Sequence, residues 1–163
     1  MKTLSRFSLV AALIAVAGTF STASMAATAT GTANATVLTP IAITAGTALN
    51  FGTFVGNTAG TVVVSTAGAR SATGGVVLAT GAGAAGTFTV TGTGTSTFSV
   101  TVPSSFTVSN GTQTMTVVPT PAGATGALVG GTASVPVGGT LTVAAGQVAG
   151  AYTGTYMMTV EYN

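Results

Sequence analysis

A strict alternation of small apolar and polar residues runs through residues 27–37. A period of two is typical of a β-strand, because successive side chains of a strand point to opposite faces. Threonines and one asparagine occupy one face, and the other face carries the small residues Ala27, Ala29, Gly31, Ala33 and Ala35, followed by Val37. Such small side chains bury little area each, so this face fits a narrow groove better than a broad core.

The rest of the chain is predicted to consist of short strands at regular intervals, with glycine or proline between them. The predicted strands are residues 37–43, 48–54, 61–65, 75–79, 87–91, 97–102, 106–109, 112–118, 126–135, 140–143 and 152–162. We expect a turn at Ala45-Gly46, an edge or a bulge at Pro40, and no helix longer than one turn after residue 26. This spacing is typical of an all-β sandwich or barrel.

The dipeptide Asn110-Gly111 predicts one hairpin in more detail. This pair is typical of a two-residue type I′ turn, because both central residues of that turn need positive φ angles. A two-residue loop would place Phe106 opposite Met115, with both side chains on one face of the hairpin. Pattern and turn geometry therefore predict the same register.

The last predicted strand, residues 152–162, also alternates. Its large apolar residues share one face and include all three tyrosines of the chain: Tyr152, Tyr156, Met158, Val160 and Tyr162. An ordinary core strand explains this stripe, because a strand with one buried face alternates in the same way. Periodicity alone therefore assigns these residues to the core.

The first 26 residues differ from the rest of the chain. Lys2 and Arg6 precede an apolar run at residues 7–17, and the small residues Ser24 and Ala26 follow it. This order predicts a secretory signal peptide cleaved after Ala26, with a retained membrane anchor as the alternative. The predicted domains are a signal peptide at residues 1–26, an N-terminal extension at residues 27–36 and a β-sandwich domain at residues 37–163. We therefore expect a secreted, extracellular protein.

Charged side chains are almost absent after residue 26, where only Arg70 and Glu161 remain and Asp, Lys, His and Cys are missing. General acid–base pairs, cysteine or histidine nucleophile systems and metal cages need these residue types. The composition therefore predicts a protein that is not an enzyme and that holds no metal and no cofactor.

The same composition limits the partners of the chain. Nucleic acid binds to clusters of Lys and Arg, which residues 27–163 lack. Membrane insertion of the mature chain is not expected, because no later run approaches about 18 consecutive apolar residues. Because the chain has no cysteine, burial must stabilise its fold without disulfides. Its zero net side-chain charge after residue 26 favours association with other copies.

Two further features are candidate sites. Arg70 lies in the glycine-rich segment 68–75, interpreted as a loop, where we expect it to bond backbone carbonyls or Glu161; ligand binding is the alternative. The Thr-Gly-Thr repeat at residues 91–95 would fit a threonine-lined solenoid of the ice-binding type. No fixed period supports that architecture, and solvent-facing threonines on ordinary strands explain the repeat.

Three segments together carry a resemblance to a known family. The C-terminal strand has a penultimate tyrosine, Tyr162, after the alternating Met158 and Val160, and Gly150 stands fourteen places from the end. Residues 48–53 include the motif LNFG, and residues 68–75 read GARSATGG. With these motifs the chain resembles pilin subunits of bacterial chaperone–usher fibres. It is most similar to cysteine-free relatives of the spore-coat-protein-U group, which include secreted bacterial domains of unknown function.

The resemblance implies an immunoglobulin-like sandwich that lacks its last strand and is completed by a donor strand from a neighbouring subunit. It also implies that the C-terminal strand borders the groove and is the edge that pairs with a periplasmic chaperone, with Gly150, Tyr152, Tyr156, Met158, Val160 and Tyr162 as its site residues. The donor would be residues 27–36, and their small, alternating face agrees with that role. A head-to-tail contact of this kind does not close, so it generates a filament. The resemblance thus implies a homopolymer that forms a cell-surface fibre, with a periplasmic chaperone and an outer-membrane usher as assembly partners. The alternative is a monomeric or fibre-tip adhesin whose own N-terminal strand fills its groove.

Overall fold

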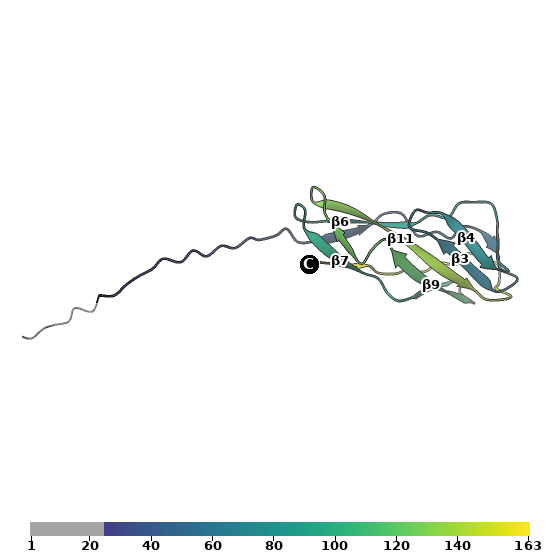
Figure 1. The fold of residues 1–163 in the computed structure, drawn as a ribbon. Helices are drawn as coiled ribbons and strands as arrows, with labels where there is room; N and C mark the ends of the chain where they lie inside the picture. Colours follow the sequence, from purple (N-terminus) through teal and green to yellow (C-terminus); the bar gives the residue numbers. More distant parts are fainter. Residues whose placement is uncertain (1–24) are drawn as a thin grey trace, which may run out of the picture. The chain divides into compact units, whose positions relative to one another are not determined.

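The computed structural model describes residues 25–163. The predicted signal peptide lies outside these residues except for Met25 and Ala26, which are exposed and belong to no strand. Contacts divide the chain after Ala35. Residues 25–35 are exposed and carry neither helix nor strand, whereas all the described strands lie in the compact unit Thr36–Asn163 (Figure 1).

Twelve strands and no helix make up the regular structure of residues 25–163. They are β1 (Ala42–Ala45), β2 (Phe54–Val55), β3 (Gly60–Val64), β4 (Arg70–Gly74), β5 (Val77–Leu78), β6 (Gly86–Thr91), β7 (Thr97–Thr101), β8 (Phe106–Ser109), β9 (Thr114–Pro121), β10 (Thr125–Ala127), β11 (Thr132–Val143) and β12 (Thr159–Tyr162). The prediction of an all-β protein is therefore confirmed.

Antiparallel pairing arranges these strands in three sheets. The largest sheet has the order β1-β6-β11-β3-β4, and β9 joins it by pairing with β11 on one side and β8 on the other. The second sheet has the order β10-β7-β12, and β2 and β5 form a short third one. The large sheet curls so that its apolar face packs against the second sheet, an arrangement consistent with a β-sandwich.

The long strand β11 joins the two halves of the large sheet. Its residues 132–137 pair with β6, and its residues 137–143 pair with β9 and β3. Gly138 and Gly139 lie at this change of partners. A Cβ atom on Gly138 would collide with the carbonyl oxygen of Val64, so only glycine lets the two backbones approach this closely.

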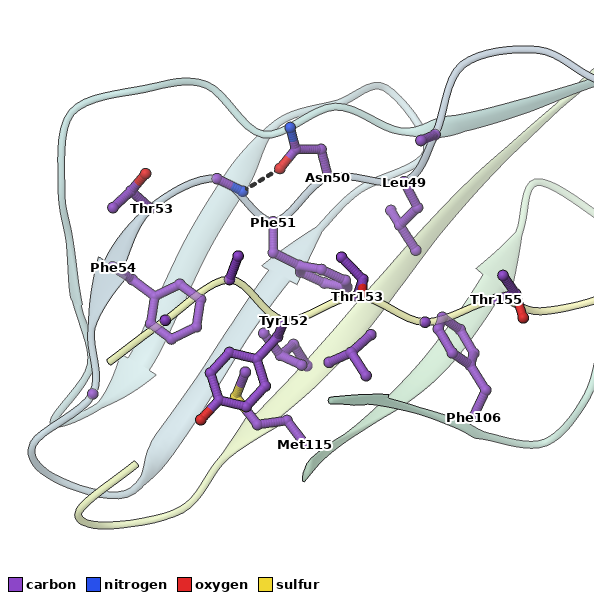
Figure 2. A pocket seen from close by; sticks show the side chains of 18 of the residues that line it. Leu49, Asn50, Phe51, Thr53, Phe54, Phe106, Met115, Tyr152, Thr153 and Thr155 are labelled. Carbon is purple, nitrogen blue, oxygen red and sulfur yellow. Dashed lines mark hydrogen bonds between the residues drawn. The ribbon is translucent and has the colours of Figure 1, made fainter. Parts of the chain in front are cut away.

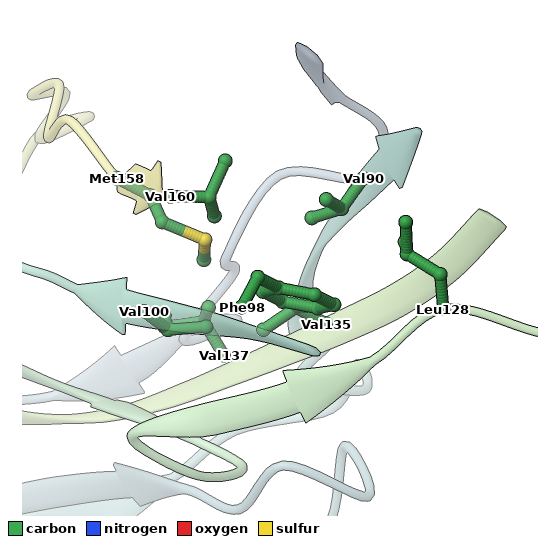
Figure 3. Packing of buried hydrophobic residues seen from close by; sticks show 8 residues of the cluster. All are labelled: Val90, Phe98, Val100, Leu128, Val135, Val137, Met158 and Val160. Atoms are coloured by element: carbon green, nitrogen blue, oxygen red, sulfur yellow. The ribbon is translucent and has the colours of Figure 1, made fainter. Parts of the chain in front are cut away.

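The core consists of two clusters of buried side chains. The first cluster lies between β6 and β11 on one side and β7 and β12 on the other (Figure 3). Its members are Val90, Phe98, Val100, Leu128, Val135, Val137, Met158 and Val160. Phe98 is fully buried at its centre. Strands therefore cover the first cluster from both sides.

The second cluster lies on the other half of the large sheet. Its buried members are Val62, Val76, Met115, Val117, Leu141 and Val143. Partly buried residues that do not belong to β3, β9 or β11 pack over this cluster, and they include Leu49, Phe51, Phe54 and Tyr152. They come from two segments that are mostly irregular. The second cluster thus has a complete sheet on one side only.

The predicted strand at residues 27–37 is wrong for a single copy of the chain. All of these residues are exposed, and none belongs to a strand. Alternation determines which side chains would share a face, but a strand also needs a neighbouring backbone that supplies hydrogen bonds. Residues 37–43 likewise become a strand only from Ala42 onward, where β6 provides that neighbour.

Other strand boundaries moved for similar reasons. β4 lies in the segment interpreted as a loop, because pairing with β3 rather than apolar alternation makes it a strand. The predicted strand 126–135 divides at Gly130 and Gly131, whose φ angles of 61° and 82° form a turn. Residues 140–143 continue β11, and only Thr159–Tyr162 of the predicted strand 152–162 form β12.

The predicted register of the Asn110-Gly111 hairpin is displaced by two residues. Phe106 pairs with Val117 rather than Met115, so the loop contains four residues instead of two. The Asn110 side chain explains the longer loop, because its Oδ1 accepts hydrogen bonds from the backbone N–H groups of Thr112 and Gln113 at 3.0 and 2.8 Å. A shift of two residues keeps every side chain on its predicted face.

Candidate functional site

A groove of about 940 Å³ opens over the second cluster (Figure 2). Residues 45–57 form its first wall, and residues 147–156 form its second wall. Between the walls it is lined by large apolar side chains, which are Phe88, Phe106, Val108, Met115 and Leu141. The groove therefore lies where the second half of the sandwich lacks a regular covering layer.

The first wall follows the edge of the large sheet beyond β1. Asn50 and Ala84 exchange two backbone hydrogen bonds of 2.8 Å, and the Asn50 Oδ1 accepts a further one from the Gly52 N–H at 2.8 Å. This local turn directs the rings of Phe51 and Phe54 toward the groove (Figure 2). The LNFG motif is thus a wall of the groove.

Arg70 supports the first wall from strand β4. Its guanidinium donates hydrogen bonds to the carbonyl oxygens of Phe51 and Thr53 in the wall, and of Ala79 and Gly81 beside it. The prediction that Arg70 bonds backbone carbonyls is confirmed. Its placement in a loop was wrong, because it pairs with Val64 in the β3–β4 ladder.

The second wall is the chain that leads into β12. Thr153 and Ser109 exchange backbone hydrogen bonds of 2.9 and 3.0 Å, which tie this wall to the edge of β8. The Tyr152 hydroxyl donates to the carbonyl of Val148 at 2.8 Å and lies 3.0 Å from the Gln147 Nε2. These contacts hold the wall without making it a strand.

Tyr156 closes one end of the groove. Its ring stacks on Phe106 with a centroid distance of 4.8 Å and meets Phe88 edge-on at 5.7 Å. Such aromatic pairs add to the stability that burial provides. Burial also raises the pKa of the Tyr156 hydroxyl above its usual value.

Within residues 25–163 the two walls share no backbone hydrogen bond with each other. Only at one end does the Gly146 N–H, just before the second wall, donate to the carbonyl of Asn57 at 3.3 Å. In the same range, the backbone groups of residues 154–156 make no backbone hydrogen bond. The groove therefore combines apolar side chains with a short segment of its second wall whose backbone groups are not used in backbone hydrogen bonds.

The C-terminal stripe predicted from the sequence divides between the two core clusters. Gly150, Tyr152 and Tyr156 line the groove. Met158 and Val160 are instead buried in the first cluster, and Tyr162 packs against it. The stripe has one continuous apolar face, but only its first part belongs to the candidate site.

The penultimate tyrosine, Tyr162, joins three parts of the chain. Its hydroxyl accepts a hydrogen bond from the Thr93 N–H and donates one to the carbonyl of Thr39, both at 2.8 Å. The N–H of Thr39 in turn bonds to Thr93 Oγ1 at 2.6 Å. Tyr162 therefore secures the backbone just before β1.

The small face predicted as a donor lies in the unit that ends at Ala35. Its members Ala27, Ala29, Gly31, Ala33 and Ala35 are all exposed. Phe51, Phe54 and Phe106 line the groove but were not predicted as site residues. The concentration of aromatic residues in and after the LNFG motif was the available signal for two of them.

The groove is lined by apolar and uncharged polar residues. The described residues contain no group of three or more His, Cys, Asp or Glu side chains that could hold a metal ion. They also contain no helix long and apolar enough to cross a membrane. Apolar side chains beside free backbone groups can bind an extended polypeptide, which adds a strand while its side chains enter the groove.

Residues 41–162 match the model of a family described as a domain of unknown function (DUF4402). The matched range includes both walls of the groove and Arg70, and it leaves residues 27–36 outside. No curated protein and no solved structure matches the chain.

Proposed function

The chain belongs to this family of unknown function, and we propose that it is a structural subunit of a secreted, pilus-like fibre on the cell surface. In this proposal, residues 27–36 of one copy enter the groove of the next copy as a donor strand. The observation that carries the proposal is the groove itself, where two walls without mutual backbone bonds flank an apolar floor. An inserted strand would complete the sandwich over the second cluster.

The donor segment has the properties that such an occupant needs. It alternates strictly, so one face would enter the groove while the threonine face remains outside. Residues 27–36 are exposed and carry no charged side chain, so burial of the side chains of their small face costs no ionic desolvation. Backbone hydrogen bonds would provide affinity, and alternate side chains would select the register.

The same geometry supports a filament rather than a closed oligomer. The donor precedes β1, and the groove lies elsewhere in the sequence, so each copy would present a donor and an acceptor that are different surfaces. A contact between two different surfaces is heterologous and propagates unless the rotation closes a ring. The resemblance to chaperone–usher pilins adds a periplasmic chaperone and an outer-membrane usher to the proposed assembly route. The proposal assigns no catalytic step to the chain.

The experiment that tests this function compares two single charges on neighbouring residues. Ala33→Asp places a carboxylate on the small face, where burial of an unpaired charge should abolish fibres. Thr32→Asp places the same charge on the outer face, so fibres should still form. Fibres are counted by negative-stain electron microscopy of the secreted protein. Equal numbers for the two variants would refute the donor-strand proposal.

A second measurement separates assembly from self-complementation. If the donor of each copy filled its own groove, the chain would remain a monomer at every concentration and would fit the adhesin alternative. We expect instead that gel filtration and light scattering detect growth of the average mass with concentration.

The donor strand must also be free at its end, so intact mass should show that the secreted chain begins at Ala27.

A further inference from the structure

Arg70 is the only cation in residues 27–163, and all four hydrogen bonds of its guanidinium go to backbone carbonyls. Nη1 donates to Phe51 and Thr53 at 3.0 and 3.1 Å. Nη2 donates to Ala79 and Gly81 at 2.8 and 2.6 Å. One side chain on β4 thus joins the first wall of the groove to the segment that follows β5.

The first wall is shaped to receive this guanidinium. Gly52 lies between the two wall carbonyls that Arg70 binds, and its φ angle is 68°. A Cβ atom at Gly52 would collide with the Arg70 Nη1, so the backbone passes directly over the planar group. Lysine could not replace it fully, because its donors radiate from one nitrogen rather than from a fixed fork.

The first wall has other supports toward its ends, where Gly46 and Thr47 share backbone hydrogen bonds with Thr87 and where β2 pairs with β5. The guanidinium matters for the groove because it holds the part of the wall between them. The Asn50–Ala84 bridge holds the wall at one end, and the Ala79 N–H bonds to the carbonyl of Thr53 at 3.0 Å. Without the guanidinium, the carbonyl oxygens of Phe51, Ala79 and Gly81 would lose their hydrogen bond, and no other described residue replaces it. The backbone at Phe51 and Gly52 would then be free to close over the floor or to move away from it, while Phe54 stays paired with Leu78.

We infer that Arg70 is a positioning residue for subunit exchange: it holds the first wall in the shape that accepts a donor strand, and it does not contact the donor itself. This inference rests on the proposed function. This inference has a distinctive consequence. Loss of the guanidinium should damage the acceptor groove of a subunit and leave its donor strand, residues 27–36, intact.

The test uses the mature chain, residues 27–163, with the variant Arg70→Met. The methionine side chain has a similar length and no N–H group that could donate a hydrogen bond. At temperatures far below melting, we expect the initial rate of fibre growth to fall by about tenfold or more, as for the loss of charge-assisted hydrogen bonds. Arg70→Lys should retain an intermediate rate. Two controls should grow at the wild-type rate: Ser71→Ala, on the same strand, and Val135→Ala, which destabilises the first cluster.

A mixing experiment distinguishes a damaged acceptor from a damaged subunit. Arg70→Met keeps its donor strand but accepts another at least about tenfold more slowly, whereas Ala33→Asp can accept but not donate. Mixed together they should form a discrete one-to-one dimer, which analytical ultracentrifugation resolves, while each variant alone stays largely monomeric over the time in which the wild type forms fibres. Fibre growth of Arg70→Met at the wild-type rate, or a mixture that remains monomeric, would overturn the inference.

Failure of the proposed function would have a different signature. Fibres formed by Ala33→Asp alone, or no assembly of the wild type, would refute donor-strand exchange. Amide hydrogen exchange still tests Arg70 in that case. The variant Arg70→Met should accelerate amide exchange in residues 50–54 by at least about tenfold, with little change in β7 and β12. Unchanged exchange in residues 50–54 would reject the positioning role whatever the assembly assay shows.

Discussion

The two core clusters are built from similar residues and differ in how they are covered. β7 and β12 pack over the first cluster, whose eight members are all buried. Over the second cluster two mostly irregular walls leave a groove of about 940 Å³, and aromatic residues such as Phe51 and Phe106 remain partly exposed. The first half of the domain therefore completes its own sandwich, and the second half does not.

A single segment of chain shows this difference within a few residues. Thr159 to Tyr162 pair with β7 in a regular ladder, whereas residues 154–156 pair with no described backbone. Both parts have the same alternating pattern. What separates them is the presence of a neighbouring strand. The apolar face therefore continues along the whole segment, although strands cover only part of it within one copy.

The comparison fails if the free subunit depends equally on its two clusters. Phe98→Ala removes the fully buried ring at the centre of the first cluster and should cost about 3 to 5 kcal/mol. Phe51→Ala removes a partly exposed ring from the groove wall and should cost clearly less in the same subunit. Urea unfolding of unassembled chains measures both. Equal losses would show that the second cluster is already closed.

If residues 27–37 occupy the groove as proposed, adding them as a peptide should reduce the difference between the halves. We predict that a peptide of residues 27–37 stabilises a chain that begins at Val37, because a ligand of the folded state alone raises the unfolding free energy. At a peptide concentration about 100 times the dissociation constant, the gain is about 2.7 kcal/mol. Thermal melting measures it. The matched control is the same peptide with Ala33→Asp, and an equal gain with that peptide would contradict groove binding.

The hydroxyl of Tyr162 should contribute a smaller amount, and to the covered half. Tyr162→Phe keeps the ring against the first cluster but leaves the Thr39 carbonyl and the Thr93 N–H without their partner. We expect a loss of about 1 kcal/mol in the unfolding free energy. Fibre growth below the melting temperature should be unchanged, because the groove is intact. A loss of assembly without a loss of stability would place Tyr162 in the acceptor instead.

The smallest expected effect is a dependence on alkaline pH. Burial raises the pKa of Tyr156, so above about pH 10 the unfolded chain releases this proton before the folded chain does. The stabilising contribution is complete below that pH and is lost as the pH rises through the raised value. Tyr156→Phe should abolish this part of the loss in denaturant unfolding at several pH values. An identical alkaline loss in the variant would mean that the Tyr156 ring is solvated in the free subunit.

Much of the fold could be predicted because alternation reports on faces. The bounds of β8 were predicted as observed, and those of β6 and β7 within one residue. Strand partners were harder, since they depend on residues distant in sequence. Residues 27–37 alternate without forming a strand, and β4 forms one without apolar alternation because β3 pairs with it. The Asn110 side chain lengthened a loop that the Asn-Gly pair alone would make shorter.

The candidate site was predicted in part. Tyr152 and Tyr156 of the C-terminal stripe line the groove, whereas Met158 and Val160 support the first cluster. Periodicity could not divide that stripe, because residues on one face of a strand look alike until the opposing layer is known. The sequence did not predict that residues 45–57 form a wall or that Arg70 supports it. Arg70 bonds to carbonyls up to 19 residues away in the chain, and only the fold brings them together.

The sequence by itself determined that this protein is all-β, which side chains share a face, and that residues 27–163 lack nearly every charged group on which catalysis or metal binding relies. These properties follow from local geometry and from composition. Only the tertiary structure decided which half of the core is covered, where the groove lies and what the single arginine holds. Each of these depends on which distant segments meet, and backbone hydrogen bonds and packing settle that across the whole fold.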